Sequence, residues 1–141
     1  MRDVIRVVLV DPGEDSRKAL QRVLGSLGSL WIAEVFPNYQ AAGSRIAEIA
    51  PDLCLVILDS DHSCSHVLKE LQSYHRFVTP NSYLIVEDTN VNGHPVFASH
   101  GPGPMEAVEV FLLRHQGFVV DHARERFLMT LNPSSFLLRT G

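Results

Sequence analysis

The sequence predicts an α/β fold of three layers, with helices on both faces of a mostly parallel sheet. Two apolar runs, residues 4–10 and 53–58, indicate strands that are buried on both faces, as central parallel strands are. Shorter apolar runs alternate with segments of helical periodicity, the order that βαβ units produce. Each long run ends at an aspartate, at the edge of the sheet where open α/β folds bind ligands.

The remaining elements follow from apolar spacing and from the Pro, Gly and Asn residues between them. Strands are expected at residues 4–10, 30–36, 53–58, 83–86, 118–121 and 136–139. Helices are expected from a cap at Asp15 or Ser16 to Leu27, and at 40–50, 63–77 and 105–115. Residues 127–131 form a further extended segment before a turn. We therefore expect one domain, residues 1–141, with strand order 2-1-3-4-6-5 and an antiparallel last strand.

Composition limits the partners that this chain is expected to have. The 141 residues carry a net charge of −4, without the basic stripe that nucleic-acid binding requires. No apolar run approaches the roughly 20 residues of a membrane span, and the first residues lead directly into a strand rather than a signal peptide. Cys54 and Cys64 fall in separate elements, so we expect no disulfide and a reducing, cytoplasmic setting.

Carboxylates follow three of the predicted strands, at Asp11, at Asp59 with Asp61, and at Glu87 with Asp88. In the predicted strand order these strand ends are neighbours. Close carboxylates are costly unless a cation or a proton neutralises them, and oxygen ligands suit Mg²⁺. The sequence therefore predicts an acidic, Mg²⁺-binding pocket open to a small-molecule ligand. The alternative is that these carboxylates cap the following helices, Asp59 the helix that starts near Ser63, and point into water.

Histidines lie near the predicted pocket. His62 comes three residues after Asp59 and could act as a general base or a ligand, although an exposed histidine at a helix start is an open alternative. His66 is expected at the surface. His94 and His100 lie in a long loop of residues 90–104, a length typical of functional or mobile loops, and could close over a ligand.

Residues 4–59 resemble the first half of a two-component receiver domain. The resemblance is carried by the run 7–11, the helix start at 15–17 and the run 50–53 leading to Asp59. It implies that Asp11 helps to hold Mg²⁺ and that Asp59 accepts a phosphoryl group. Pro12 replaces the second acid of that family, and the lysine at the end of its fifth strand has no counterpart, which leaves the phosphoryl charge without its usual partners.

Residues 55–140 resemble the carboxyl-terminal part of the cephalosporin hydroxylase and rhamnosyl O-methyltransferase family. The matching motifs are VILDSDHS at 56–63, VLKEL at 67–71, SYLIVEDT at 82–89, GPGP at 101–104 with Ala107-Val108, and FLMTLNP at 127–133. This resemblance implies a Mg²⁺ site made by Asp59, Glu87 and Asp88, S-adenosylmethionine as methyl donor, and His62 at the position of a catalytic base.

The turn at residues 11–14 departs from the methyltransferase pattern, because it has one glycine and two acids in place of a glycine-rich turn. The acids would repel the carboxylate of S-adenosylmethionine, and one βα unit is absent before residue 59. Our first interpretation is therefore a recombined or engineered α/β domain, receiver-like over 1–59 and methyltransferase-like over 60–141. It keeps an acidic Mg²⁺ pocket without a complete catalytic apparatus. The alternatives are a divergent metal-dependent O-methyltransferase and a receiver-type phosphoacceptor.

Overall fold

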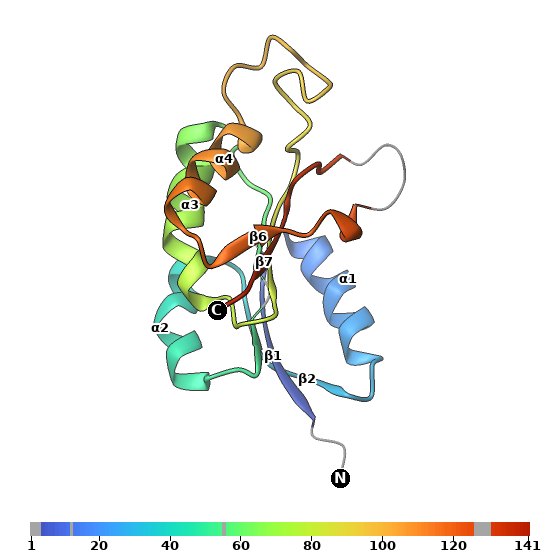
Figure 1. Cartoon of the computed structure of the whole chain (residues 1–141). Coiled ribbons are helices and arrows are strands. Elements are labelled where there is room, and N and C mark those ends of the chain that lie inside the picture. The colour runs from blue at the N-terminus through green and yellow to red at the C-terminus, as the bar shows by residue number, and fades with distance from the viewer. Residues whose placement is uncertain (1–3, 12, 55, 126–130) are drawn as a thin grey trace. The chain divides into compact units, whose positions relative to one another are not determined.

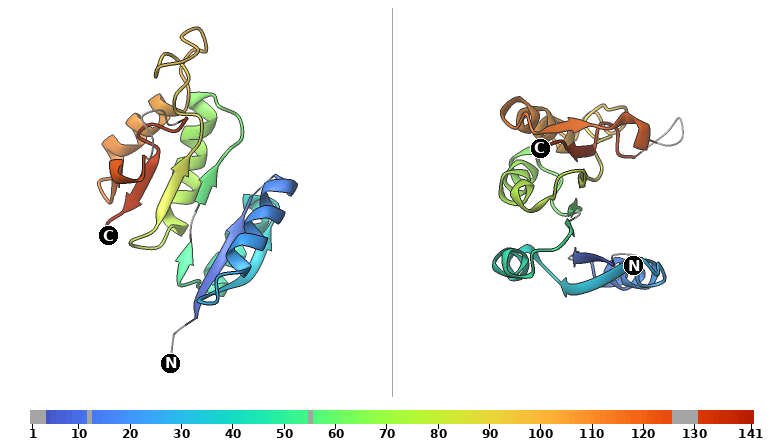
Figure 2. Two further views of the ribbon diagram at one scale, coloured as in Figure 1. Left: turned by 90° about the vertical axis from the view of Figure 1, so that its right-hand side faces the viewer. Right: turned by 60° about the horizontal axis from the view of Figure 1, so that its bottom comes forward.

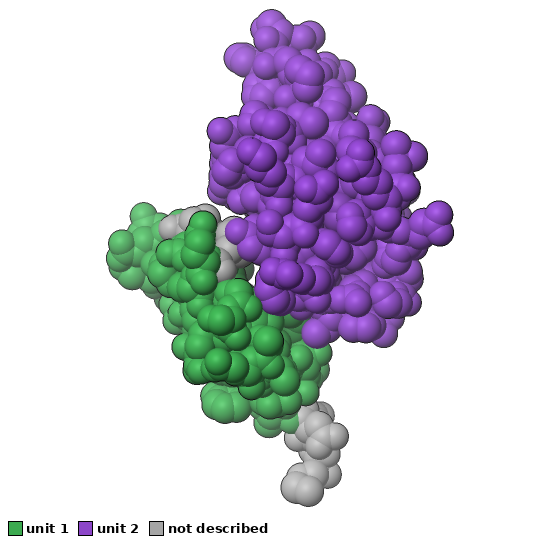
Figure 3. All heavy atoms as spheres, turned by 90° about the vertical axis from the view of Figure 1, so that its left-hand side faces the viewer, with its two compact units in different colours: residues 1–56 green, residues 57–141 purple. Residues whose placement is uncertain are grey.

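Helices and strands alternate along the chain, which confirms the predicted α/β class (Figure 1). The computed structural model describes residues 4–11, 13–54, 56–125 and 131–141. It divides into two compact units, residues 1–56 and 57–141 (Figure 3). The division falls inside the predicted third strand, and each unit is described separately below.

The first unit contains a parallel three-stranded sheet. Its strands are β1 (Ile5–Val10), β2 (Leu30–Phe36) and β3 (Leu53–Cys54), in the order β2-β1-β3. Residues 7–10 of the central strand β1 are all buried. Arg6, the one charge in this strand, donates to both carboxylate oxygens of Asp52 and to the Ala50 carbonyl, and so joins β1 to the start of β3.

Two helices cover opposite faces of this sheet, α1 (Glu14–Gly25) and α2 (Tyr39–Ile49) (Figures 1 and 2). Asn38 caps α2, because its side-chain oxygen accepts the Ala41 N–H at 2.8 Å. The predicted cap of α1 at Asp15 or Ser16 is wrong. The helix begins at Glu14, and the Ser16 hydroxyl donates to Asp11 instead of accepting a helix N–H.

The second unit contains a mixed four-stranded sheet. Its strands are β4 (Val56–Leu58), β5 (Tyr83–Val86), β7 (Phe136–Arg139) and β6 (Phe118–Val120), in that spatial order. The last strand, β7, is antiparallel to both of its neighbours. Within each unit the strand order agrees with the prediction. The strands β3 and β4 both lie within the predicted third strand, residues 53–58, and Leu55 between them lies outside the described residues.

The helices of the second unit are α3 (Cys64–Tyr74) and α4 (Pro104–Arg114), with short 3₁₀ turns η1 (His75–Phe77) and η2 (His122–Arg124). The two helices pack against each other on one face of the sheet (Figure 1). Leu71 of α3, Phe111 of α4 and Leu84 of β5 are fully buried between these layers. Each such side chain contributes about 1.5–3 kcal/mol by leaving water, so this core fixes the strand ends that follow.

A long connection leaves β5 and reaches α4 at Pro104, at one end of the second sheet (Figure 1). Its first residues are held by the segment before β7: the Thr89 hydroxyl donates to the Pro133 carbonyl at 2.6 Å, and the Asn90 N–H to the Leu131 carbonyl at 3.3 Å. Both Thr89 and Asn90 are buried. The predicted extended segment 127–131 lies outside the described residues except for Leu131.

Two further observations bear on the predictions from composition. Neither Cys54 nor Cys64 forms a disulfide with another described residue. In the described part of the chain, no helix has the length and apolarity that crossing a membrane requires.

Candidate active site

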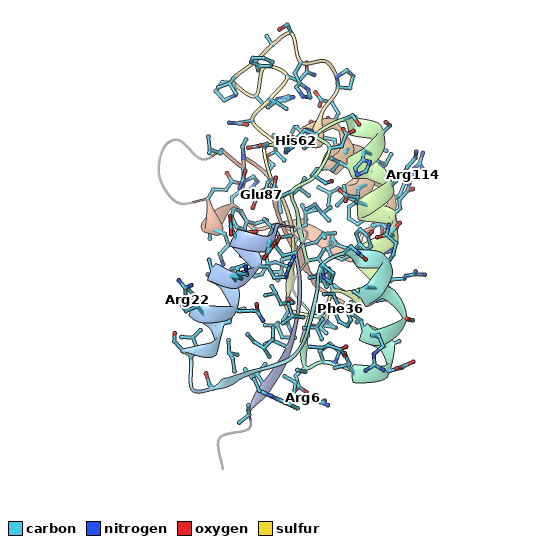
Figure 4. All side chains as sticks on the ribbon, turned by 180° about the vertical axis from the view of Figure 1, so that it is seen from behind. Arg6, Arg22, Phe36, His62, Glu87 and Arg114 are labelled. Atoms are coloured by element: carbon cyan, nitrogen blue, oxygen red, sulfur yellow. The ribbon has the colours of Figure 1, made fainter. Side chains whose placement is uncertain are left out.

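The second unit brings three of the predicted site residues together at the end of its sheet. The Nε2 atom of His62 lies 3.2 Å from Oδ2 of Asp88 and 3.7 Å from Oδ1 of Asp59. These residues come from the loop after β4 and the loop after β5, two neighbouring strands. Figure 4 shows His62 at the end of the sheet from which the long loop leaves.

The environment of the His62 nitrogen is unusual. Nε2 is buried from solvent and, among the described residues, has no hydrogen-bond partner, although two carboxylates lie within 4 Å. The side chains of Asp59 and Asp88 are themselves 60% and 42% exposed. A buried nitrogen without a partner costs stability, so this arrangement favours a bound group that would supply one.

The loop that carries His62 is fixed by its own polar side chains. Oδ1 of Asp61 accepts the Ser63 N–H at 2.8 Å, which lowers the pKa of Asp61 and starts α3. Thus Asp61, rather than Asp59, makes the helix-start hydrogen bond that the alternative hypothesis assigned to Asp59. The Ser60 hydroxyl donates to Oε2 of Glu70 at 2.9 Å.

Asp88 reaches His62 because its backbone turns sharply. Its φ angle is 53°, in the left-handed region that aspartate adopts more readily than most residues with a side chain. The Asp88 N–H donates to Oδ1 of Asn132 at 2.8 Å, so the side chain of another segment completes this turn. The carboxylate of Asp88 is therefore not used to hold its own backbone.

The preceding residue, Glu87, continues the pairing of β5 with β4. Its N–H donates to the Leu58 carbonyl at 3.0 Å, and the residue is half-buried (Figure 4). Glu87 is thus fixed beside Asp88 at the end of the sheet that carries His62. Its role as a metal ligand stays a prediction.

Asp11 belongs to the first unit and has different partners. Its Oδ1 accepts the Gly13 N–H at 2.7 Å, and its Oδ2 accepts the Ser16 hydroxyl at 2.6 Å. A Cβ atom added at Gly13 would lie 2.4 Å from the Ser16 Oγ, so the side chains of this turn already fill the space beside it. Asp11 therefore holds the turn before α1, and both of its carboxylate oxygens have partners within that turn.

The other histidines of the prediction have separate partners. His66 is exposed and pairs with Glu70 at 3.6 Å. In the long loop, His94 Nε2 lies 3.0 Å from Oε1 of Glu106, while the ring of His100 lies against that of Phe97. His94 is thus tied to the start of α4.

Sequence reasoning missed Glu106 and Glu70. Glu106 accepts the Gly103 N–H at 2.7 Å, the bond that an acid makes at the third position of a helix. The acid three residues after Gly103, beside Pro104 at the first turn, was the signal that could have found it. No sequence pattern indicates the role of Glu70. Burial raises the pKa of its carboxyl group, although the Ser60 hydroxyl donates a hydrogen bond to it.

The donor chemistry of this site suits a hard divalent ion, because carboxylate oxygens from the ends of two strands lie near one imidazole. Across the described ranges, however, no group of three or more His, Cys, Asp or Glu side chains is arranged to hold a metal ion. The site thus offers Asp59 and Asp88 as oxygen donors, each within 4 Å of the His62 nitrogen.

Comparison with known proteins identifies the family. A family model described as Rhamnosyl O-methyltransferase/CmcI matches residues 39–140. The chain belongs to this family. The match confirms the resemblance over residues 55–140 and extends it to α2 and β3. The receiver resemblance stays a prediction, and the family match covers its residues 39–59.

Curated relatives in this family include rhamnosyl O-methyltransferases of Mycobacterium tuberculosis (strain ATCC 25618 / H37Rv), Mycobacterium bovis (strain BCG / Pasteur 1173P2) and Mycobacterium leprae (strain TN). Each is 41% identical over 97 residues, or 67% of this chain. The match covers 40% of the first two relatives and 42% of the third, so the chain spans well under half of their length. No solved structure gives a significant match.

Proposed function

We propose that residues 57–141 form the proton-abstracting part of an O-methyltransferase site, in which His62 is the general base. The acceptor is a hydroxyl group, and the relatives, which are rhamnosyl O-methyltransferases, make a rhamnosyl hydroxyl the acceptor that we propose. His62 would take the proton of this hydroxyl as the acceptor oxygen bonds to the methyl group. The bond from that methyl group to the sulfonium sulfur of S-adenosylmethionine would break, and S-adenosylhomocysteine would leave. The proton ends on the imidazole.

The buried Nε2 atom of His62 carries this proposal. It lacks a hydrogen-bond partner in the described structure and lies within 4 Å of two carboxylates. An acceptor hydroxyl placed against this nitrogen would satisfy it. Once the imidazole has taken the proton, Asp88 and Asp59 stabilise the positive charge at 3.2 and 3.7 Å.

Two further groups belong to the proposal. The acids that we propose as oxygen donors for Mg²⁺ are Asp59, Asp88 and the adjacent Glu87, although the described side chains are not arranged around a metal ion. A bound Mg²⁺ would supply a Lewis acid. S-adenosylmethionine would supply the methyl group. Because the turn after β1 is filled by Asp11 and Ser16, we assign no cofactor-binding role to that turn.

The test is methyl transfer from radiolabelled S-adenosylmethionine to a methyl rhamnoside, with Mg²⁺ present, by the full chain and by His62→Ala. Loss of a general base lowers the rate by about 10²–10⁴-fold. His122→Ala is the matched control, because His122 is exposed on η2. We expect this control to retain the wild-type rate.

Two results would overturn the proposal. One is a wild-type chain that transfers no methyl group and shows no heat of binding with S-adenosylmethionine in calorimetry. The other is a His62→Ala variant as active as the wild type. Omission of Mg²⁺ with added chelator tests the metal separately, and an unchanged rate removes Mg²⁺ from the proposal.

A further inference from the structure

The carboxylate of Glu106, in the first turn of α4, holds both arms of the loop 90–103. On the outgoing arm, the Asn92 side-chain amide lies 2.7 Å and the His94 Nε2 atom 3.0 Å from Glu106 Oε1. On the returning arm, the Gly103 N–H donates to Oε2 at 2.7 Å. One side chain thus binds both Asn92 and Gly103, which are eleven positions apart in the sequence, and so closes the loop.

These contacts favour the charged form of Glu106. Partial burial raises the pKa of the carboxyl, but the hydrogen bonds from Gly103, His94 and Asn92 outweigh it and hold the pKa at about 2. The carboxylate is therefore ionised at any pH at which methyl transfer would be measured. Charge-assisted bonds of this kind are about twice as strong as neutral ones.

The returning arm of the loop packs against the backbone of the His62 segment. The Cys64 N–H donates to the Pro102 carbonyl at 3.0 Å. Gly103 is buried, and a Cβ atom added there would lie 3.4 Å from the His62 carbonyl oxygen and 3.0 Å from a methyl group of Val91. Little space remains between this arm and His62, so a displaced Gly103 would move it.

The outgoing arm begins at Asp88, whose carboxylate lies 3.2 Å from His62 Nε2. The Val91 N–H lies 3.4 Å from the Asp88 carbonyl, directly after the left-handed turn at Asp88. The loop therefore leaves from Asp88 and returns to His62, and Glu106 fastens it in between. The same loop thus joins the backbone of the His62 segment to Asp88, whose carboxylate lies 3.2 Å from His62 Nε2.

We infer that Glu106 is a positioning residue: by fastening the loop 90–103 it holds the backbone on either side of the His62–Asp88 pair. The expected effect on catalysis rests on the proposed function above. The expected effect on the position of the His62 imidazole does not depend on that function. Without this carboxylate, three donors lose their partner and both arms are released. Small misplacements of a catalytic group are costly, up to about 10²-fold in rate for a shift of about 1 Å.

The test compares Glu106→Gln and Glu106→Ala with wild type by nuclear magnetic resonance and hydrogen exchange. We expect the ring resonances of His62 to shift and the protected amides of residues 91–103 to exchange at least about 10-fold faster, as local opening predicts. Glu109→Gln, an exposed change on the same helix, is the matched control and should leave both readouts unchanged. Unchanged His62 resonances and loop exchange in both Glu106 variants would overturn the inference.

Milder variants serve if the Glu106 substitutions prevent folding. Asn92→Ala and His94→Ala each remove one of the three bonds and leave the carboxylate in place. We expect each to give the same changes at His62 and the loop with smaller amplitude, and the inference fails if neither does.

Activity then separates the inference from the proposed function. In Glu106→Gln we expect kcat to fall about 10-fold, with KM for S-adenosylmethionine unchanged, because orientation rather than binding is lost. If the wild type transfers no methyl group, the proposed function fails, while the resonance and exchange experiments still judge the role of Glu106.

Discussion

Both units of this chain place an aspartate shortly after a buried strand, but the two carboxylates have different partners. Asp11, after β1, accepts the Gly13 N–H and the Ser16 hydroxyl of its own turn. Asp88, after β5, has its turn completed by Asn132, and its carboxylate faces His62. The comparison teaches that a strand-end acid becomes available for chemistry when another segment holds its backbone.

The largest effect is expected from Asp88→Asn. Asparagine tolerates the left-handed backbone and leaves the bond from residue 88 to Asn132 intact, so the change removes the negative charge beside His62, which is also a proposed Mg²⁺ donor, without disturbing the turn. We expect methyl transfer to fall by about 10²-fold, the effect that loss of one electrostatic contact to the transition state can have, with the thermal unfolding temperature unchanged. Wild-type activity in the Asp88→Asn variant would contradict the proposal that Asp88, unlike Asp11, takes part in the chemistry.

Asp59→Asn should have a smaller effect on the same assay. Its carboxylate is farther from His62 Nε2, at 3.7 Å, and is 60% exposed, so water screens its charge more strongly. We expect a loss of about 10-fold, which a charge interaction of this kind in partly aqueous surroundings allows. A larger loss than that of Asp88→Asn would reverse the order and make Asp59 the principal partner.

Asp11→Ala should act on stability rather than on transfer. It removes two hydrogen bonds of the turn that precedes α1, and loss of one such bond costs about 1 kcal/mol. Amide exchange in α1 and urea denaturation measure this loss, and methyl transfer should remain at the wild-type rate. If transfer instead falls as far as in Asp88→Asn, Asp11 belongs to the site after all.

The smallest effect is expected from Glu70→Gln, which changes the buried carboxyl group that accepts the Ser60 hydroxyl in the His62 loop. Burial raises the pKa of Glu70 above its ordinary value of 4.5, so the folded state holds this proton more tightly than the unfolded state. Its contribution to stability is present below pH 4.5 and is lost as pH rises through the folded pKa. The free energy of unfolding of Glu70→Gln, relative to wild type, should therefore rise between about pH 4 and pH 7; a fall would contradict it.

Sequence patterns predicted the strands well because burial controls them. The strands Leu30–Phe36, Tyr83–Val86 and Phe136–Arg139 have their predicted bounds, and each is an apolar run with turn residues nearby. Helix starts were harder to predict. Ser16 was expected to cap α1, but its hydroxyl reaches back to Asp11, a choice between two local hydrogen bonds that periodicity does not report.

The candidate site was predicted in part. His62 and Asp59 follow one strand and Asp88 the next, so strand order alone brings them to one end of the sheet. The contact of Asp88 with His62 also needs the left-handed turn and its bond to Asn132, forty-four residues away. Glu106 was missed because its partners are loop residues, whose contacts have no periodicity.

The positive φ angle of Asp88 restricts what natural variation can place at this position. A glutamate would keep the charge but prefers other backbone angles, whereas glycine and asparagine would keep the turn and lose the carboxylate. In a library with every amino acid at position 88, Asp, Asn and Gly should dominate the folded variants. Selection for methyl transfer should then retain only Asp. Backbone geometry and charge would thus act as two successive filters on a single amino acid.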